Sequence, residues 1–174
     1  MSPDCEHVVL VGLMGVGKST VGARLSEVLG WPLVDSDEQV EAATGRTVRE
    51  IFERDGEAAF RGFEARALAE ALDAPGPSII AAAGGVVLTE ENRRRLKAPK
   101  VEVVWLEADP ATVTVRAVEG VHRPLLADDP AGVLARMAVE REPLYREVAD
   151  HVVDVDGRSV EEVTDSVLEV IGAC

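Results

Sequence analysis

Cysteine and histidine are scarce in this chain, and their scarcity excludes several kinds of protein. Two cysteines occur among 174 residues, Cys5 and Cys174, and they lie near the two ends of the sequence. They provide neither a disulfide framework nor the spacing of a zinc or redox motif, which is typical of a reducing compartment. The three histidines, His7, His122 and His151, are scattered, so we expect no structural zinc site. We expect a cytoplasmic protein.

Long apolar runs and positive charge are also in short supply. No segment reaches the length of about eighteen apolar residues that a membrane span needs. The acidic N-terminal segment leads into a short apolar run, so we expect no secretory signal. The chain carries 32 acidic and 18 basic residues, a net charge of −14, which repels nucleic acids and anionic membranes. We therefore expect neither as a partner, and a small anionic ligand would need positive charge gathered at its site.

What is present is a regular alternation of two kinds of segment. Short β-branched runs, expected as strands at 7–11, 32–35, 78–82, 101–106 and 151–155, are separated by longer amphipathic stretches. This alternation is typical of βαβ units on a parallel sheet, and 174 residues suit one α/β domain. Helices are expected at 18–29, 37–43, 47–54, 57–72, 89–96, 109–118, 130–148 and 159–170.

The most specific motif is G-L-M-G-V-G-K-S at residues 12–19, between the first expected strand and the first expected helix. Its glycines allow backbone N–H groups to point inward, where the positive end of the helix adds to the pocket. In such a P-loop, Lys18 would reach the β- and γ-phosphates of a nucleoside triphosphate, and the Ser19 hydroxyl would bind Mg²⁺. The alternative is a glycine-rich turn without a ligand. The predicted nucleotide-binding residues here are Gly12, Gly15, Val16, Gly17, Lys18, Ser19 and Thr20.

Two carboxylates follow the second expected strand, at the edge where open α/β sheets bind ligands. Asp35 and Asp37 would share one face of an extended segment and point into one crevice. Phosphoryl transfer needs one acidic group near Mg²⁺ and another near the attacking hydroxyl. The alternative is that Asp37 caps the following helix and Asp35 merely ends the strand.

Two further segments have local explanations that need no ligand. Arg61 and Glu64 are three positions apart in an expected helix, which by default makes a surface ion pair. Gly84 and Gly85 end the third expected strand, where backbone N–H groups could approach a ligand or simply form a turn.

The last candidate segments lie around a stretch without periodic pattern at about 119–129. An arginine on such a loop, Arg123, could close over the phosphates, or it could remain solvated. Arg141 lies in the next expected helix, and Pro143 is expected to kink or break that helix and so aim Arg141 inward.

Taken in order, the P-loop, D-S-D, F-R-G-F-E, double glycine, R-P-L-L and R-E-P-L-Y-R segments resemble those of the shikimate kinases over about residues 8–170. The resemblance implies a three-layer α/β/α P-loop kinase domain over 1–174, with its core at about 7–172. Its parallel five-stranded sheet would have the order 2-3-1-4-5. It further implies a shikimate-binding region at about 35–64 and a lid at about 119–129. The implied reaction transfers the γ-phosphoryl group of ATP to the 3-hydroxyl of shikimate, in chorismate and aromatic amino-acid biosynthesis.

The resemblance also implies roles for individual residues. Asp37 would hold the shikimate hydroxyls and is the candidate base, Asp35 would support Mg²⁺ through water, and Arg61 and Arg141 would grip the substrate carboxylate. The remaining roles are backbone donors to substrate at Gly84 and Gly85, the lid arginine at Arg123, adenine stacking at Arg116 and an adenine-side turn at Arg158.

One position departs from the family pattern, which has three glycines after the third strand. Here the first is Ala83, and a positive φ at this residue would strain it. We expect Ala83 to weaken shikimate binding modestly. We also expect the protein to be a monomer. Two alternatives stay open, namely a related kinase of another polyol or sugar acid and a nucleotide-binding module without catalysis.

Overall fold

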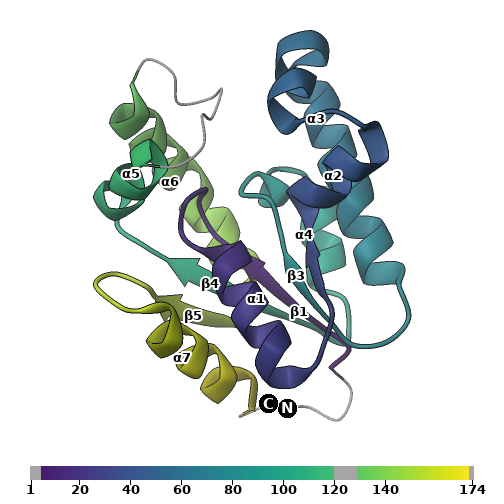
Figure 1. The fold of residues 1–174 in the computed structure, drawn as a ribbon, viewed down its shortest axis with the longest axis vertical. Helices are drawn as coiled ribbons and strands as arrows, with labels where there is room; N and C mark the ends of the chain where they lie inside the picture. Colours follow the sequence, from purple (N-terminus) through teal and green to yellow (C-terminus); the bar gives the residue numbers. More distant parts are fainter. Residues whose placement is uncertain (1–4, 120–128, 173–174) are drawn as a thin grey trace.

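A parallel five-stranded sheet, in the order β2-β3-β1-β4-β5, forms the centre of the molecule, as predicted (Figure 1). The structure, a computed structural model, describes residues 5–119 and 129–172. The strands are β1 (His7–Val11), β2 (Leu33–Asp35), β3 (Ser78–Ala81), β4 (Val101–Glu107) and β5 (His151–Asp154). The helices are α1 (Lys18–Leu29), α2 (Ser36–Thr44), α3 (Val48–Asp73), the 3₁₀ turn η1 (Val86–Leu88), α4 (Glu90–Leu96), α5 (Pro110–Glu119), α6 (Pro130–Val148) and α7 (Val160–Gly172).

Helices cover both faces of the sheet. Helices α1 and α7 pack side by side on one face, while α3, α4 and α6 lie on the other. Right-handed crossovers between parallel strands require α1 to lie on the face opposite α3, α4 and α6, and α7 follows the last strand. Helix α2 packs on α3, and α5 packs on α6. None of the helices within the described ranges is long and apolar enough to cross a membrane.

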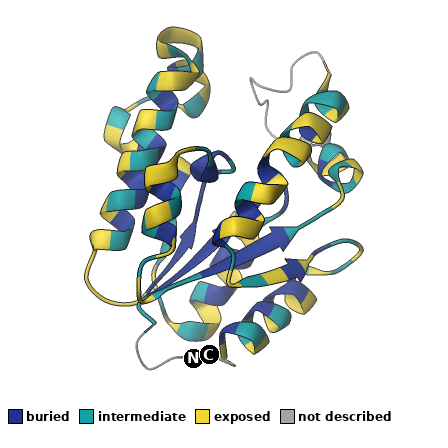
Figure 2. Cartoon of the chain, turned by 180° about the vertical axis from the view of Figure 1, so that it is seen from behind, coloured by how far each residue is buried: buried dark blue, intermediate teal, exposed yellow. Residues whose placement is uncertain are grey.

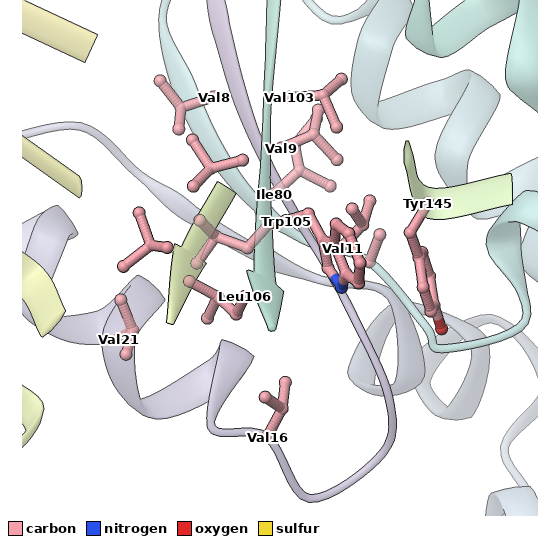
Figure 3. Packing of buried hydrophobic residues seen from close by; sticks show 14 of the residues in the cluster. Val8, Val9, Val11, Val16, Val21, Ile80, Val103, Trp105, Leu106 and Tyr145 are labelled. Atoms are coloured by element: carbon pink, nitrogen blue, oxygen red, sulfur yellow. The ribbon is translucent and has the colours of Figure 1, made fainter. Parts of the chain in front are cut away.

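The central strand β1 shows why the strand sequences are continuous apolar runs. Val8 to Val11 are all fully buried, because helices cover both sides of the sheet (Figure 2). In register, Val9 lies beside Ile80 of β3 and Val103 of β4, and these side chains pack in the main core (Figure 3). A rigid sheet therefore holds the loops at its carboxyl edge, where the polar motifs were predicted.

Local signals set several helix ends as predicted. Gly30 ends α1 and Gly45 ends α2, both with positive φ. Thr47 begins α3 in a capping box with Glu50. The predicted separation of 47–54 from 57–72 is also present, because Gly56 inside α3 has non-helical angles (φ 81°, ψ 174°).

The predicted break at Pro143 does not occur. Helix α6 continues from Pro130 to Val148 with Pro143 inside it. Pro143 is exposed, whereas Arg141 and Tyr145 are buried. The buried face of α6, rather than a break, therefore turns Arg141 inward.

Candidate active site

A cavity of about 310 Å³ opens at the carboxyl edge of the sheet. It brings together the P-loop, the last residue of β2 (Asp35) with Asp37, and the segment that leads into the double glycine. Its lining residues are Met14, Gly15, Gly17, Lys18, Ser19, Thr20, Asp35, Asp37, Ala81, Ala82, Ala83 and Gly84. Three motifs that the sequence separates by tens of residues thus face one space.

The P-loop backbone has the shape that phosphate binding needs. Gly12 has φ 142°, and a Cβ there would lie 2.5 Å from the Leu106 carbonyl oxygen, so only glycine fits. Gly15 and Gly17 also have positive φ, and Gly17 directly precedes α1, so the positive N-terminal end of α1 begins at the cavity. The Lys18 Nζ donates to the carbonyl oxygens of Gly12 and Leu13, at 2.9 Å each.

Asp35 performs two tasks at the end of β2. One carboxylate oxygen accepts from the Ser19 hydroxyl at 2.5 Å. The other accepts from the backbone N–H groups of Asp37 at 2.9 Å and Glu38 at 3.4 Å, which makes Asp35 the N-cap of α2. The residue therefore links the P-loop to the start of α2.

The predicted extended segment at 35–37 is wrong, because α2 already begins at Ser36. Capping by Asp35 satisfies the first free N–H groups of the helix and draws Asp37 into its first turn. Asp37 still lines the cavity together with Asp35, and Asp37 is exposed to solvent. The alternative in which Asp37 is the cap is also wrong.

Ser19 and Asp35 offer oxygen atoms of the kind that Mg²⁺ prefers. Within residues 5–119 and 129–172, no group of three or more histidine, cysteine, aspartate or glutamate side chains is placed to hold a metal. Such a sparse donor set suits Mg²⁺, which is usually held by one or two protein oxygens together with phosphates and water.

Arg61 forms the ion pair with Glu64 that its spacing predicted, but Glu64 is buried and the pair does not lie on the surface. Its guanidinium donates to Glu64 at 2.6 Å and to Glu57 at 2.8 Å. Glu64 is only 2% exposed, and this burial raises its pKa, while the positive charge of Arg61 offsets part of the rise. The buried carboxylate of Glu64 thus fixes the position of the Arg61 guanidinium.

Arg141 reaches the same region from α6 and is 3% exposed. A Cβ on Gly84 would lie 3.6 Å from its Nη1, and a Cβ on Gly85 would collide with the Arg61 guanidinium. The double glycine therefore lies between two guanidinium groups from different helices. The Nε atoms of both arginines are buried and have no hydrogen-bond partner in the described protein.

The backbone strain that a positive φ would cause at Ala83 does not arise. Lys100 is the only described non-glycine residue with positive φ, so Ala83 adopts its conformation without strain. Its methyl group lies on the cavity wall and occupies space that a glycine would leave open.

The nucleotide-side arginines differ in their surroundings. Arg116 on α5 donates to the Val16 carbonyl at 3.4 Å, which places it beside the P-loop. Arg158 follows β5, and its guanidinium donates to the Asp154 and Glu162 carbonyls and to the Ser166 hydroxyl. It thereby fixes the connection from β5 to α7. Arg123 and nearly all of the predicted lid at 119–129 lie outside the described residues.

Two side chains at this site received no role from the sequence. Glu64 was considered only as half of a surface pair, although its position in α3 is buried. Tyr145 follows Arg141 by four positions, and this spacing was the available signal that both share one helix face. Its hydroxyl donates to the Gly84 carbonyl at 2.5 Å.

Comparison with known proteins agrees with this geometry. The family model described as Shikimate kinase matches residues 14–172. A shikimate kinase of Symbiobacterium thermophilum is 45% identical over 166 residues, which cover 94% of each chain. One of Bradyrhizobium diazoefficiens is 48% identical over 141 residues, covering 80% of this chain and 67% of the relative.

Solved structures give the same result. A shikimate kinase from Acinetobacter baumannii in complex with shikimate superimposes with a TM-score of 0.92 at 34% identity, covering 97% of this chain and 94% of the other. A gluconokinase from Sinorhizobium meliloti, at 18% identity and a TM-score of 0.56, shares the fold alone. The chain therefore belongs to the shikimate kinase family.

Proposed function

We propose that this protein transfers the γ-phosphoryl group of ATP to the 3-hydroxyl of shikimate, giving ADP and shikimate 3-phosphate. The observation that carries the proposal is that a phosphate-binding loop, Asp37 and Gly84 line one cavity, while the buried Arg141 lies beside Gly84 and the partly exposed Arg61 lies against Gly85. The solved relative that contains shikimate supports the choice of acceptor.

On the donor side, the P-loop residues bind the triphosphate through backbone N–H groups and Lys18. Lys18 exchanges the carbonyls of Gly12 and Leu13 for phosphate oxygens, which places its charge where negative charge gathers during transfer. Arg116 stacks on the adenine, Arg158 shapes the adenine-side turn, and Arg123 closes over the phosphates.

Mg²⁺ is the proposed ion, with Ser19 and Asp35 as its protein partners. When bound, it neutralises charge on the phosphate oxygens. The 2.5 Å contact between the Ser19 hydroxyl and Asp35 already holds both oxygen donors at the mouth of the P-loop.

On the acceptor side, Arg61 and Arg141 bind the shikimate carboxylate. A guanidinium group provides the fork geometry that suits a carboxylate. Gly84 lies beside Arg141 and Gly85 beside Arg61, and their backbone N–H groups add donors to the substrate.

Asp37 accepts a hydrogen bond from the attacking hydroxyl. The bond between the hydroxyl oxygen and the γ-phosphorus forms as the bond to the leaving ADP oxygen breaks, and the hydroxyl proton passes to Asp37. Positioning and charge neutralisation carry most of the catalysis in this kind of reaction.

Several wider features belong to the same proposal. Residues 1–174 act as one kinase domain with its acceptor region at 35–64 and its lid at 119–129. The protein acts as a monomer in the cytoplasm, on the route to chorismate and the aromatic amino acids.

The test is ADP release from the purified protein with Mg-ATP and shikimate, quinate, gluconate or no acceptor. We expect turnover that depends on shikimate. Lys18→Ala should abolish it, whereas Lys97→Ala, which alters a surface lysine paired with Glu147, should not. Turnover on gluconate instead of shikimate would contradict the acceptor, and ATP binding without turnover on any acceptor would contradict catalysis.

A further inference from the structure

Tyr145 is buried next to Gly84 and Arg141 and has no part in the chemistry described above. It is 1% exposed, and its ring packs on Trp105 with centroids 5.8 Å apart (Figure 3). Its hydroxyl donates at 2.5 Å to the carbonyl of Gly84, which lies 61 positions earlier in the chain. One residue of α6 thus fastens the loop that follows β3.

The hydroxyl is a permanent donor. Burial raises the pKa of Tyr145 to about 12, and the positive charge of Arg141 offsets part of that rise. The phenol therefore keeps its proton at every pH at which the protein functions. A buried hydroxyl without a partner would be costly, so the bond to Gly84 is held firmly.

The bond has a geometric consequence one residue further on. The Gly84–Gly85 peptide is trans and planar, so the Gly84 carbonyl and the Gly85 N–H point in opposite directions within the peptide plane. Two consecutive glycines have the widest choice of backbone angles, and nothing in their own chemistry selects one. A hydrogen bond on the carbonyl side therefore also sets the direction of the N–H on the other side.

We propose that Tyr145 is a positioning residue, which orients the Gly84–Gly85 peptide so that the Gly85 N–H faces shikimate between Arg61 and Arg141. This inference rests on the proposed acceptor site. It concerns ground-state binding of shikimate, because Tyr145 contacts Gly84 and Arg141 on the acceptor side and Trp105 in the core.

The test is Tyr145→Phe, which keeps the ring against Trp105 and removes the hydroxyl alone. We expect KM for shikimate to rise about tenfold, the scale of one lost hydrogen bond, while kcat and KM for ATP stay within about twofold. The matched control is Thr164→Val in α7, which also removes a buried hydroxyl, one that donates to Val160 at 2.7 Å far from the cavity. It should lower thermal stability without changing KM for shikimate.

An unchanged KM for shikimate in Tyr145→Phe would overturn the inference, whatever happens to its stability. Since this outcome requires a wild-type protein that turns over shikimate, it leaves the proposed function intact. A wild-type protein that fails to bind shikimate would overturn both.

A second measurement leaves the side chain in place. Tyr145 is the only tyrosine in the chain, so growth with 3-fluorotyrosine gives a single ¹⁹F resonance beside the Gly84 carbonyl. We expect shikimate to shift this resonance and quinate at the same concentration to shift it less. A resonance that saturating shikimate does not move would overturn the inference, even if Tyr145→Phe could not be purified.

Discussion

The Arg61 guanidinium lies against the backbone of Gly85 so closely that any side chain at residue 85 would collide with it. The backbone of Gly85 has φ −92°, so conformational freedom is not the reason for glycine there. The reason is the space that the arginine occupies. Both residues contribute to the proposed shikimate site, so the absence of a Cβ at one sets the position of the other.

Gly85→Ala should therefore weaken shikimate binding through Arg61. We expect the added methyl to displace the guanidinium and to raise KM for shikimate at least about tenfold, with KM for ATP unchanged. Gly62→Ala is the matched control, because a Cβ at this exposed position of α3 meets nothing within 4 Å. Steady-state kinetics of both variants would measure this effect. Equal KM values for shikimate would contradict the collision between a side chain at residue 85 and Arg61.

Arg61→Lys should be far from conservative. An ammonium is a point charge and cannot bind a carboxylate in fork geometry while holding Glu57 and Glu64. We expect calorimetric titration to show shikimate affinity lowered at least tenfold, on the order expected for a lost charge-assisted hydrogen bond. Arg49→Lys, which alters an exposed arginine paired with Glu53 on the same helix, should bind normally. Near-normal binding by Arg61→Lys would refute the carboxylate assignment.

Asp37→Asn tests whether a base is required. If Asp37 takes the hydroxyl proton, kcat at saturating shikimate should fall by about a hundredfold or more, the usual share of general base catalysis. Glu38→Gln, the same kind of change at the next exposed residue, should leave kcat unchanged. If kcat of Asp37→Asn stays within about tenfold of the wild type, the carboxylate only positions the hydroxyl.

Asp35→Asn should separate the two tasks of this residue. Asparagine caps a helix as well as aspartate does, so the melting temperature should be almost unchanged. It lacks the negative charge that attracts Mg²⁺, so the Mg²⁺ concentration for half-maximal activity should rise about tenfold. Asp109→Asn, another aspartate that caps a helix, is the control and should alter neither property. A variant that loses stability but keeps its Mg²⁺ dependence would contradict the assignment to the ion.

Glu64 should make stability depend on pH in a predictable direction. Burial raises its pKa above that of a glutamate in the unfolded chain. At a pH between these two pKa values, Glu64 is protonated in the folded state and ionised in the unfolded state. The folded state therefore binds more protons, and the free energy of unfolding falls as pH rises through that window. Glu64→Gln removes this titration.

Urea unfolding at a series of pH values would measure this dependence. The wild-type protein should lose stability relative to Glu64→Gln as pH rises from the ordinary glutamate range to the raised pKa, and the difference should then level off. Curves that run parallel over the whole range would show that Glu64 does not titrate in the folded protein as described.

Signals confined to a few neighbouring residues were read correctly from the sequence. Gly30 and Gly45 end helices because only a residue without a side chain adopts their left-handed angles easily, and the glycine spacing of the P-loop needs no tertiary information. The order of the strands came from the family resemblance, since local pattern does not specify which strands are neighbours.

Features that depend on competition or burial were missed. Only Asp37 was expected as a possible cap of this helix, whereas in the folded chain Asp35 is the cap and the helix begins at Ser36. Arg61 and Glu64 have the same spacing whether their helix face is exposed or buried. Proline usually interrupts a helix, but Pro143 lies on the exposed side of α6, where packing of the opposite face keeps the helix continuous.

The contact of Lys18 with the carbonyls of Gly12 and Leu13 bears on how the enzyme receives ATP. The ammonium lies 2.9 Å from each carbonyl oxygen and so stabilises the backbone of the P-loop in the shape described above. An arriving triphosphate then exchanges one set of acceptors for another and needs to order little backbone. Affinity for the nucleotide accordingly reflects the difference between phosphate and peptide oxygens as partners of one lysine.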